Sequence, residues 1–142
     1  MRIGLVGYGK GGRYFHAPFI ASLPDATFIG VVTRSPERRA ELAQDHPQAV
    51  AFDSLADMVA AGVDAVAIST PMESRPALIL EAIELGVAVV SDKPFAADAE
   101  QAQALVDAAE RKGVLLSVYQ NRRWDSDFLT VRKLLDDGLL GD

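Results

Sequence analysis

The sequence predicts an α/β fold in which helices cover both faces of a doubly wound parallel sheet. Six short segments rich in Val, Ile and Leu recur along the chain, they lack strict polar alternation, and segments with helix signals separate them. Strands that alternate with helices form βαβ units with right-handed crossovers, and such units build a parallel sheet. The predicted strands are Arg2–Val6, Thr27–Thr33, Ala49–Phe52, Val63–Thr70, Val87–Ser91 and Val114–Tyr119.

The composition is that of one globular domain without disulfides. The chain has 142 residues, 49% of them hydrophobic and 24% charged, and no apolar run approaches the ~20 residues that cross a bilayer. A net charge of −6 disfavours nucleic acid as a partner. There is no cysteine, and His16 and His46 are too few for a metal cluster, so we expect no metal. The absence of cysteine also makes the cytoplasm the expected compartment, and the segment after Arg2 is too short and too rich in glycine for a signal peptide.

Capping residues mark where the predicted helices begin and end. Ser35 precedes a proline at a first helical position. Asp98 and Gln101 have the spacing of a capping box ahead of an apolar helical face. Gly86 and Gly113 stand where helix stops are expected.

A glycine-rich turn follows the first predicted strand. It reads Gly7-Tyr8-Gly9-Lys10-Gly11-Gly12, and a helix is expected from about Arg13. The glycines match the pattern G-x-G-x-x-G, which permits a tight turn, close approach of backbone to a pyrophosphate, and packing of helix on strand. Free N–H groups at the start of the helix would hold the phosphate. The turn therefore predicts dinucleotide binding, the alternative being a structural turn without a ligand.

Hydroxyl and basic residues end the second predicted strand. Thr33 follows Gly12 by 21 residues, where an NAD-binding fold places an acid on the ribose 2′-hydroxyl, yet the residues there are Thr33, Arg34 and Ser35. With Arg38 and Arg39 beyond, the segment suits a 2′-phosphate and favours NADP over NAD. The alternative is that Ser35 only caps the helix and the arginines are solvated.

Polar residues also follow the fourth, fifth and sixth predicted strands. The fourth strand leads into Ser69-Thr70-Pro71, and the fifth into Asp92-Lys93-Pro94. Because ligands of such sheets bind outside the carboxyl ends of the strands, Lys93 is a candidate to stabilise charge on a substrate oxygen; the alternative is a surface lysine. The sixth strand leads into a polar and aromatic cluster at the same edge, residues 119–124. The alternative is that Trp124 packs beneath the last helix and that the arginines are solvated or pair with Asp125 and Asp127.

Taken in order, these landmarks resemble the glucose–fructose oxidoreductase, inositol dehydrogenase and rhizopine-catabolism (Gfo/Idh/MocA) family over the whole chain. The motifs that carry the resemblance are the glycine loop, Thr70-Pro71, Lys93-Pro94 and Asn121-Arg122-Arg123. The segment 112–125 and the opening Gly7-Tyr8-Gly9 with Phe15-His16 look most like the NADP-dependent scyllo-inositol dehydrogenase-like members.

The resemblance implies an NADP-binding Rossmann domain of an oxidoreductase that transfers hydride to or from a secondary alcohol or ketone of a sugar or polyol such as a cyclitol. Lys93 would be the active-site lysine. His16 matches a frequent histidine of this subgroup, with helix packing expected more than cofactor contact. The implied cofactor-binding residues are Gly7, Tyr8, Gly9, Lys10, Gly11, Gly12, Thr33, Arg34, Ser35, Ser69, Thr70, Pro71, Lys93 and Asn121.

The chain departs from the family pattern at two residues and in length. Asp92 replaces the usual Glu and is expected still to hold the lysine, and Arg75 replaces the usual His. Family members continue into a second α/β domain, which supplies the proton-transferring histidine; residues 1–142 are expected to be the dinucleotide-binding domain alone. A non-catalytic NADP(H)-binding module is therefore the alternative function, and a methyltransferase or a nucleotide-independent scaffold is a weaker one.

A last helix is predicted over 125–137. Its apolar residues at helical spacing would face the missing domain, and such exposed faces favour self-association, so a homo-oligomer is expected. These residues are Phe128, Val131, Leu134 and Leu135.

Overall fold

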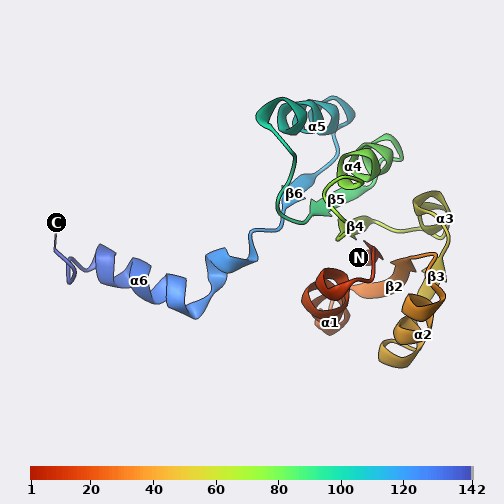
Figure 1. Ribbon diagram of the computed structural model, residues 1–142, viewed down its shortest axis with the longest axis horizontal. Helices are drawn as coiled ribbons and strands as arrows, with labels where there is room; N and C mark the ends of the chain where they lie inside the picture. The colour runs from red at the N-terminus through yellow and green to blue at the C-terminus, as the bar shows by residue number, and fades with distance from the viewer. Residues whose placement is uncertain (142) are drawn as a thin grey trace.

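The computed structural model, which describes residues 1–141, is a six-stranded parallel sheet with helices on both faces (Figure 1). The strands are β1 (Arg2–Val6), β2 (Thr27–Val32), β3 (Val50–Phe52), β4 (Ala65–Ile68), β5 (Ala88–Ser91) and β6 (Leu116–Val118). The helices are α1 (Ala17–Ser22), α2 (Pro36–Asp45), α3 (Leu55–Ala60), α4 (Arg75–Glu84), α5 (Ala99–Lys112) and α6 (Ser126–Asp136), with a wide π-type turn η1 (Gly12–His16) and a 3₁₀ turn η2 (Asn121–Trp124). No helix within residues 1–141 has the length and apolar character that crossing a membrane requires.

The strand order is β3-β2-β1-β4-β5-β6, and every neighbouring pair is parallel. This order confirms the predicted doubly wound class. The winding direction reverses between β1 and β4, so a crevice for ligands is expected beyond the carboxyl ends of these two strands. Five of the six strands are shorter than predicted by one to four residues, because the backbone joins the sheet after the apolar run begins or leaves it before the run ends.

The core consists of one apolar layer on each face of the sheet. Side chains from α1 and α2 pack on one face, and side chains from α3, α4 and α5 pack on the other. Adjacent residues of β1 divide between the layers, since Leu5 belongs to the first and Val6 to the second. This alternation is the one that a pleated strand covered on both faces requires.

The predicted helix caps are present. The Ser35 hydroxyl accepts a hydrogen bond from the Arg38 N–H at 3.3 Å, and the Asp98 carboxylate accepts one from the Gln101 N–H at 2.8 Å. Gly113, with φ of 65°, ends α5 in the left-handed conformation that favours glycine.

One sheet face is not fully covered, contrary to the sequence expectation. An apolar groove of about 470 Å³ runs beside α1 over β4, β5 and β6, and the exposed side chains of Phe19, Leu23 and Leu115 border it. Within the described residues no helix follows β6 back across the sheet, because α6 extends away from the body of the domain (Figure 1).

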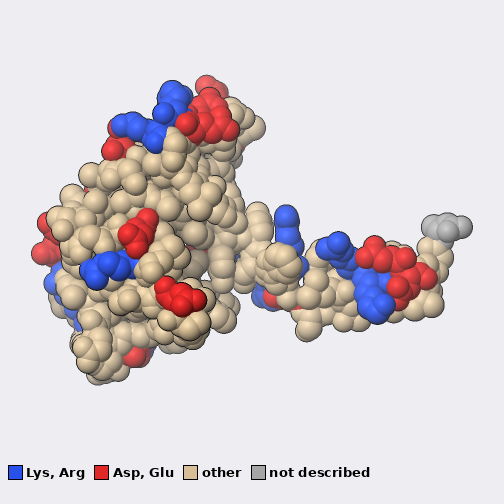
Figure 2. Space-filling view, turned by 180° about the vertical axis from the view of Figure 1, so that it is seen from behind, with Lys and Arg blue, Asp and Glu red and all other residues tan. Residues whose placement is uncertain are grey.

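The terminal helix stands apart in the space-filling view, with charged side chains of both signs gathered on it (Figure 2). Its apolar residues Phe128, Val131 and Leu135 are exposed, as expected. Trp124 is 75% exposed, so the alternative that it packs beneath this helix is wrong. Arg122 does pair with Asp125, at 2.6 Å.

Candidate functional site at the carboxyl edge of the sheet

Three glycines give the turn after β1 its shape. Gly7 has φ of +96°, and a Cβ there would lie 2.7 Å from the Ser69 carbonyl oxygen. A Cβ on Gly12 would overlap the carbonyl oxygen of Gly7. A Cβ on Gly9 would meet no atom of residues 1–141 within 4 Å. Gly7 and Gly12 are therefore required by packing, whereas Gly9 exposes its backbone to open space that a ligand can approach.

The helix that follows begins earlier than predicted. It starts at Lys10 rather than near Arg13, and the Arg13 N–H donates to the Gly9 carbonyl at 2.8 Å. Amide groups ahead of Arg13 belong to the first turn, which lacks acceptors within the helix. The turn continues as the π-type segment η1, a helix irregularity that is frequent at functional sites.

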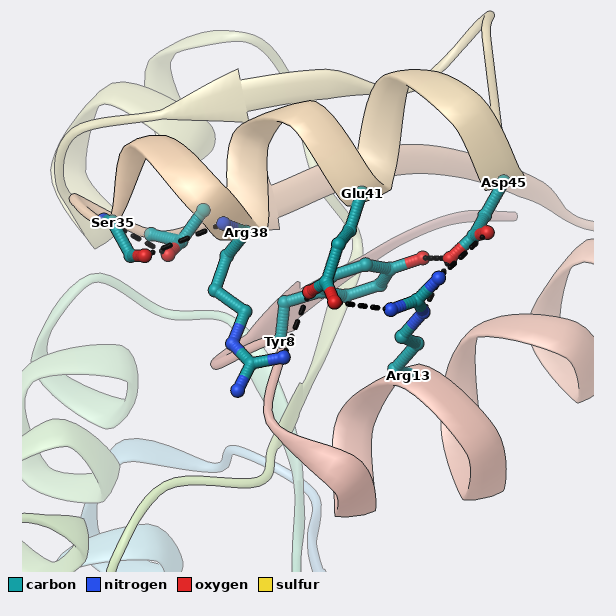
Figure 3. Close-up of polar contacts among 7 residues, drawn as sticks. Tyr8, Arg13, Ser35, Arg38, Glu41 and Asp45 are labelled. Carbon is teal, nitrogen blue, oxygen red and sulfur yellow. Dashed lines mark hydrogen bonds and ion pairs between the residues drawn. The ribbon is translucent and has the colours of Figure 1, made fainter.

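Tyr8 lies in the glycine turn, but its side chain points away from it (Figure 3). The buried phenol donates to Asp45 at 2.9 Å, and Arg13 binds Asp45 at 2.6 Å and also pairs with Glu41. Glu41 in turn holds Arg38 at 2.7 Å. Only the backbone of Tyr8 is therefore available to contact a ligand.

Two pKa values reflect this network. Burial and the hydrogen bond to Asp45 raise the pKa of Tyr8, and the Arg13 guanidinium lowers the pKa of Asp45. The network joins the glycine helix to α2, and nothing in the sequence predicted it.

The residues after β2 divide into engaged and free groups. Arg39 pairs with Asp53 at 2.5 Å and donates to the Thr33 carbonyl at 3.1 Å. Arg34 makes only a 3.4 Å hydrogen bond through Nε, to the Asp53 carbonyl, and has no ion pair within residues 1–141. The hydroxyls of Thr33 and Ser35 accept backbone N–H groups at 3.4 and 3.3 Å, which leaves their O–H groups to donate. Arg34 and these two O–H donors are thus the groups at this edge that an anionic ligand could engage.

Asp92 is the centre of a second network, and here the structure differs from the expectation that this carboxylate holds Lys93. Its Oδ1 lies 2.7 Å from His16 Nε2, and its Oδ2 accepts the Ser69 hydroxyl at 2.7 Å. Burial opposes ionisation, but the hydrogen bonds from His16 and Ser69 and the charge of Arg75 outweigh it and lower the pKa of Asp92. Both carboxylate oxygens are therefore committed to groups other than the lysine.

Arg75, which the sequence showed only as a departure from the family pattern, joins two loops. Its side chain is 5% exposed and donates to the Thr70 carbonyl at 2.6 Å, the Asp92 carbonyl at 2.8 Å and the Pro94 carbonyl. These carbonyls lie in the loops after β4 and β5, so Arg75 fixes one loop against the other. Arg75 Nε and Thr70 Oγ1 are buried and have no hydrogen-bond partner among residues 1–141.

A cavity of about 220 Å³ brings together residues that are far apart in the sequence. It is lined by Gly11, Phe15, Asp92, Lys93, Tyr119, Asn121 and Arg122. Lys93 and Asn121 thus share a cavity with the glycine turn, as predicted from their strand ends. Thr33, Arg34 and Ser35 do not line it, because they follow β2, on the other side of β1.

The lysines of the chain differ in their partners. Lys112 pairs with Glu84 at 2.5 Å, and Lys133 pairs with Asp137 at 2.7 Å. Lys10 and Lys93 have no carboxylate within 4.0 Å among residues 1–141. The two lysines without an ion pair are therefore the two that belong to the candidate site.

These features fit a dinucleotide. Open space at Gly9 suits the approach of a pyrophosphate, the unpaired amines of Lys10 and Lys93 suit polar or anionic groups, and the buried Thr70 hydroxyl lacks the partner that a ligand could supply. The fold and the site together define a nucleotide-binding domain of the Rossmann class.

The chain belongs to the GFO/IDH/MocA oxidoreductase family, whose model, an NAD-binding Rossmann fold, matches residues 1–120. It is 37% identical to scyllo-inositol 2-dehydrogenase (NADP(+)) IolW of Bacillus subtilis, over all of this chain and 39% of that protein. It is 33% identical to inositol 2-dehydrogenase of Rhizobium meliloti, over all of this chain and 42% of that protein. The crystal structure of an NAD-binding protein from Listeria innocua superposes with a TM-score of 0.91 at 33% identity, covering 99% of this chain and 41% of the other. The chain thus spans about two fifths of the length of these relatives.

Proposed function

We propose that residues 1–142 form the cofactor-binding domain of an NADP-dependent oxidoreductase that transfers hydride between NADP(H) and a secondary alcohol or ketone of a sugar or cyclitol. The observation that carries the proposal is the glycine turn, in which Gly9 faces open space and Gly11 lines a cavity together with Lys93, a lysine without an ion pair among residues 1–141. Family membership and the names of the inositol dehydrogenases support the reaction class.

Each group of residues has a role in this proposal. The backbone of Gly7, Gly9 and Gly12 receives the pyrophosphate. Arg34, with the hydroxyls of Thr33 and Ser35, receives the 2′-phosphate of the adenosine ribose, because a guanidinium and hydroxyls suit a phosphate dianion. The remaining contacts to the cofactor come from Tyr8, Lys10, Gly11, Ser69, Thr70, Pro71 and Asn121.

Lys93 acts on the substrate. The nicotinamide, when bound, supplies the hydride donor or acceptor. The Lys93 ammonium donates a hydrogen bond to the substrate oxygen and stabilises the negative charge that develops on it. A group outside this site takes or gives the proton.

Nucleotide titration tests the cofactor assignment. Titrations followed by the fluorescence of the reduced nucleotide should give a Kd for NADPH at least about tenfold lower than the Kd for NADH. A tenfold difference corresponds to about 1.4 kcal/mol of binding free energy. Arg34→Ala should abolish most of this difference by weakening NADPH binding alone. Arg132→Ala, on α6, is the matched control and should change neither Kd. Equal affinity for NADPH and NADH would contradict the assignment.

The Gly9→Ala variant tests the glycine turn. The added methyl group meets no protein atom within 4 Å, so the thermal unfolding curve should stay unchanged while NADPH affinity falls about tenfold or more. Full NADPH affinity in a folded Gly9→Ala protein would refute the proposed site.

A further inference from the structure

Asp92 and Lys93 are adjacent in the sequence at the end of β5, yet their charged groups do not pair. Both residues line the same cavity, where an ammonium and a carboxylate attract each other and would form an ion pair if the carboxylate had no other partner. In this structure the carboxylate is the group that is bound, with His16 on Oδ1 and Ser69 on Oδ2 at 2.7 Å each.

His16 is fixed in the position from which it binds Asp92. It is 5% exposed, it belongs to the wide turn η1, and its ring lies against the Tyr119 ring with centroids 4.4 Å apart. The Tyr119 hydroxyl donates to the Phe15 carbonyl at 3.2 Å, which holds the tyrosine against the same turn. The hydrogen bond between His16 and Asp92 therefore connects the helix after the glycine turn to the end of β5, 76 residues further along the chain.

We propose that His16 is a positioning residue for Lys93: by binding Asp92 it prevents an Asp92–Lys93 ion pair and leaves the lysine amine free in the nucleotide cavity. Ser69 has the same effect through the other carboxylate oxygen. The inference deepens the proposed function and rests on it for the statement that the amine meets a substrate oxygen. That the amine is unpaired can be measured without a nucleotide.

The contact between His16 and Asp92 also connects the glycine turn to the segment that carries Lys93. A Cβ on Gly11 would lie 2.6 Å from the Ser69 hydroxyl and 3.4 Å from Asp92 Oδ2, so the glycine turn touches the groups that hold the carboxylate. A shift of the turn on nucleotide binding would therefore reach Asp92 directly and Lys93 through it.

Trace acetylation tests the proposal in the chain without nucleotide. The protein is treated with a small amount of acetic anhydride, and mass spectrometry gives the modification of Lys93 relative to Lys10. Lys112 and Lys133, which are ion-paired, report any general change in reactivity. An amine that enters an ion pair becomes less reactive, so His16→Ala should lower the Lys93 to Lys10 ratio several-fold and leave the other two lysines unchanged.

Three further variants separate positioning from a general structural effect. His16→Gln places an amide N–H near the position of Nε2 and should keep the wild-type ratio. Asp92→Asn should restore the ratio in the His16→Ala background, because the amide cannot form the ion pair. Ser69→Ala should lower the ratio in the same direction, and serves if His16→Ala does not fold.

The outcomes are distinct. An unchanged ratio in folded His16→Ala and Ser69→Ala, or a decrease that persists in the double variant with Asp92→Asn, would overturn the positioning role. Failure to bind NADPH while the acetylation ratios follow expectation would overturn the proposed function and leave the inference on His16 in place.

Discussion

Replacing Arg75 with methionine should destabilise the domain strongly while keeping most of the side-chain volume. Arg75 is 5% exposed, and its guanidinium donates to three backbone carbonyls in the loops after β4 and β5. Hydrogen bonds from charged donors contribute about 1.5–3 kcal/mol each, so the three together contribute at most about 4.5–9 kcal/mol. Burial of the cation offsets part of this sum, because no carboxylate pairs with Arg75 within residues 1–141. We expect a net loss of about 3 kcal/mol.

Urea denaturation measures this loss. With a slope of about 1–3 kcal/mol per molar urea, the midpoint of unfolding should fall by about 1–3 M. The loss of about 3 kcal/mol is a large part of the ~5–15 kcal/mol free energy of unfolding of a typical domain. The control is Arg132→Met on α6, whose side chain is 65% exposed and should change stability by no more than about 0.5 kcal/mol. A loss below about 1 kcal/mol in Arg75→Met would show that the carbonyls find other partners and that Arg75 does not fix the two loops.

Three other perturbations have defined outcomes. The pKa of Asp92 is lowered in the fold from its ordinary value of 3.8, so its contribution to stability is complete above pH 3.8 and is lost as the pH falls through the folded-state pKa. Asp92→Asn should therefore make the free energy of unfolding depend less on pH in acid, as followed by circular dichroism. An unchanged acid profile would contradict this. Tyr8→Phe removes the 2.9 Å hydrogen bond to Asp45 and should lower the urea-derived stability by about 1 kcal/mol, whereas a neutral effect would mean that Arg13 alone satisfies the carboxylate. The exposed apolar face of α6 should drive self-association in sedimentation velocity, and Phe128→Asp with Leu135→Asp should yield monomers; a monomeric wild type would refute the expected homo-oligomer.

The parts of the fold that the sequence predicts are those set by local chemistry. Six apolar runs, the caps at Ser35 and Asp98 and the stop at Gly113 depend on neighbouring residues only, and all are present in the structure. Alternation of strand and helix then predicts the parallel sheet, and the sheet places Lys93 and the glycine turn at one edge.

The parts that were missed depend on contacts between distant segments. His16 meets Asp92 across 76 positions, and Arg75 reaches carbonyls that carry no side-chain signal at all. The departure at Arg75 was visible in the sequence, but its partners become visible only once the loops after β4 and β5 are placed side by side. The direction of α6 was equally hidden, because an amphipathic pattern shows that a helix has an apolar face and does not show what covers that face.

The uncovered sheet beside α1 has a practical consequence for anyone who handles this polypeptide. The apolar groove of about 470 Å³ there, bordered by Phe19, Leu23 and Leu115, exposes hydrophobic surface to water at a cost in free energy. Hydrophobic attraction strengthens on warming from the cold, so storage near 4 °C at low concentration should keep the material clear, while concentrated samples should turn cloudy well below their melting temperature.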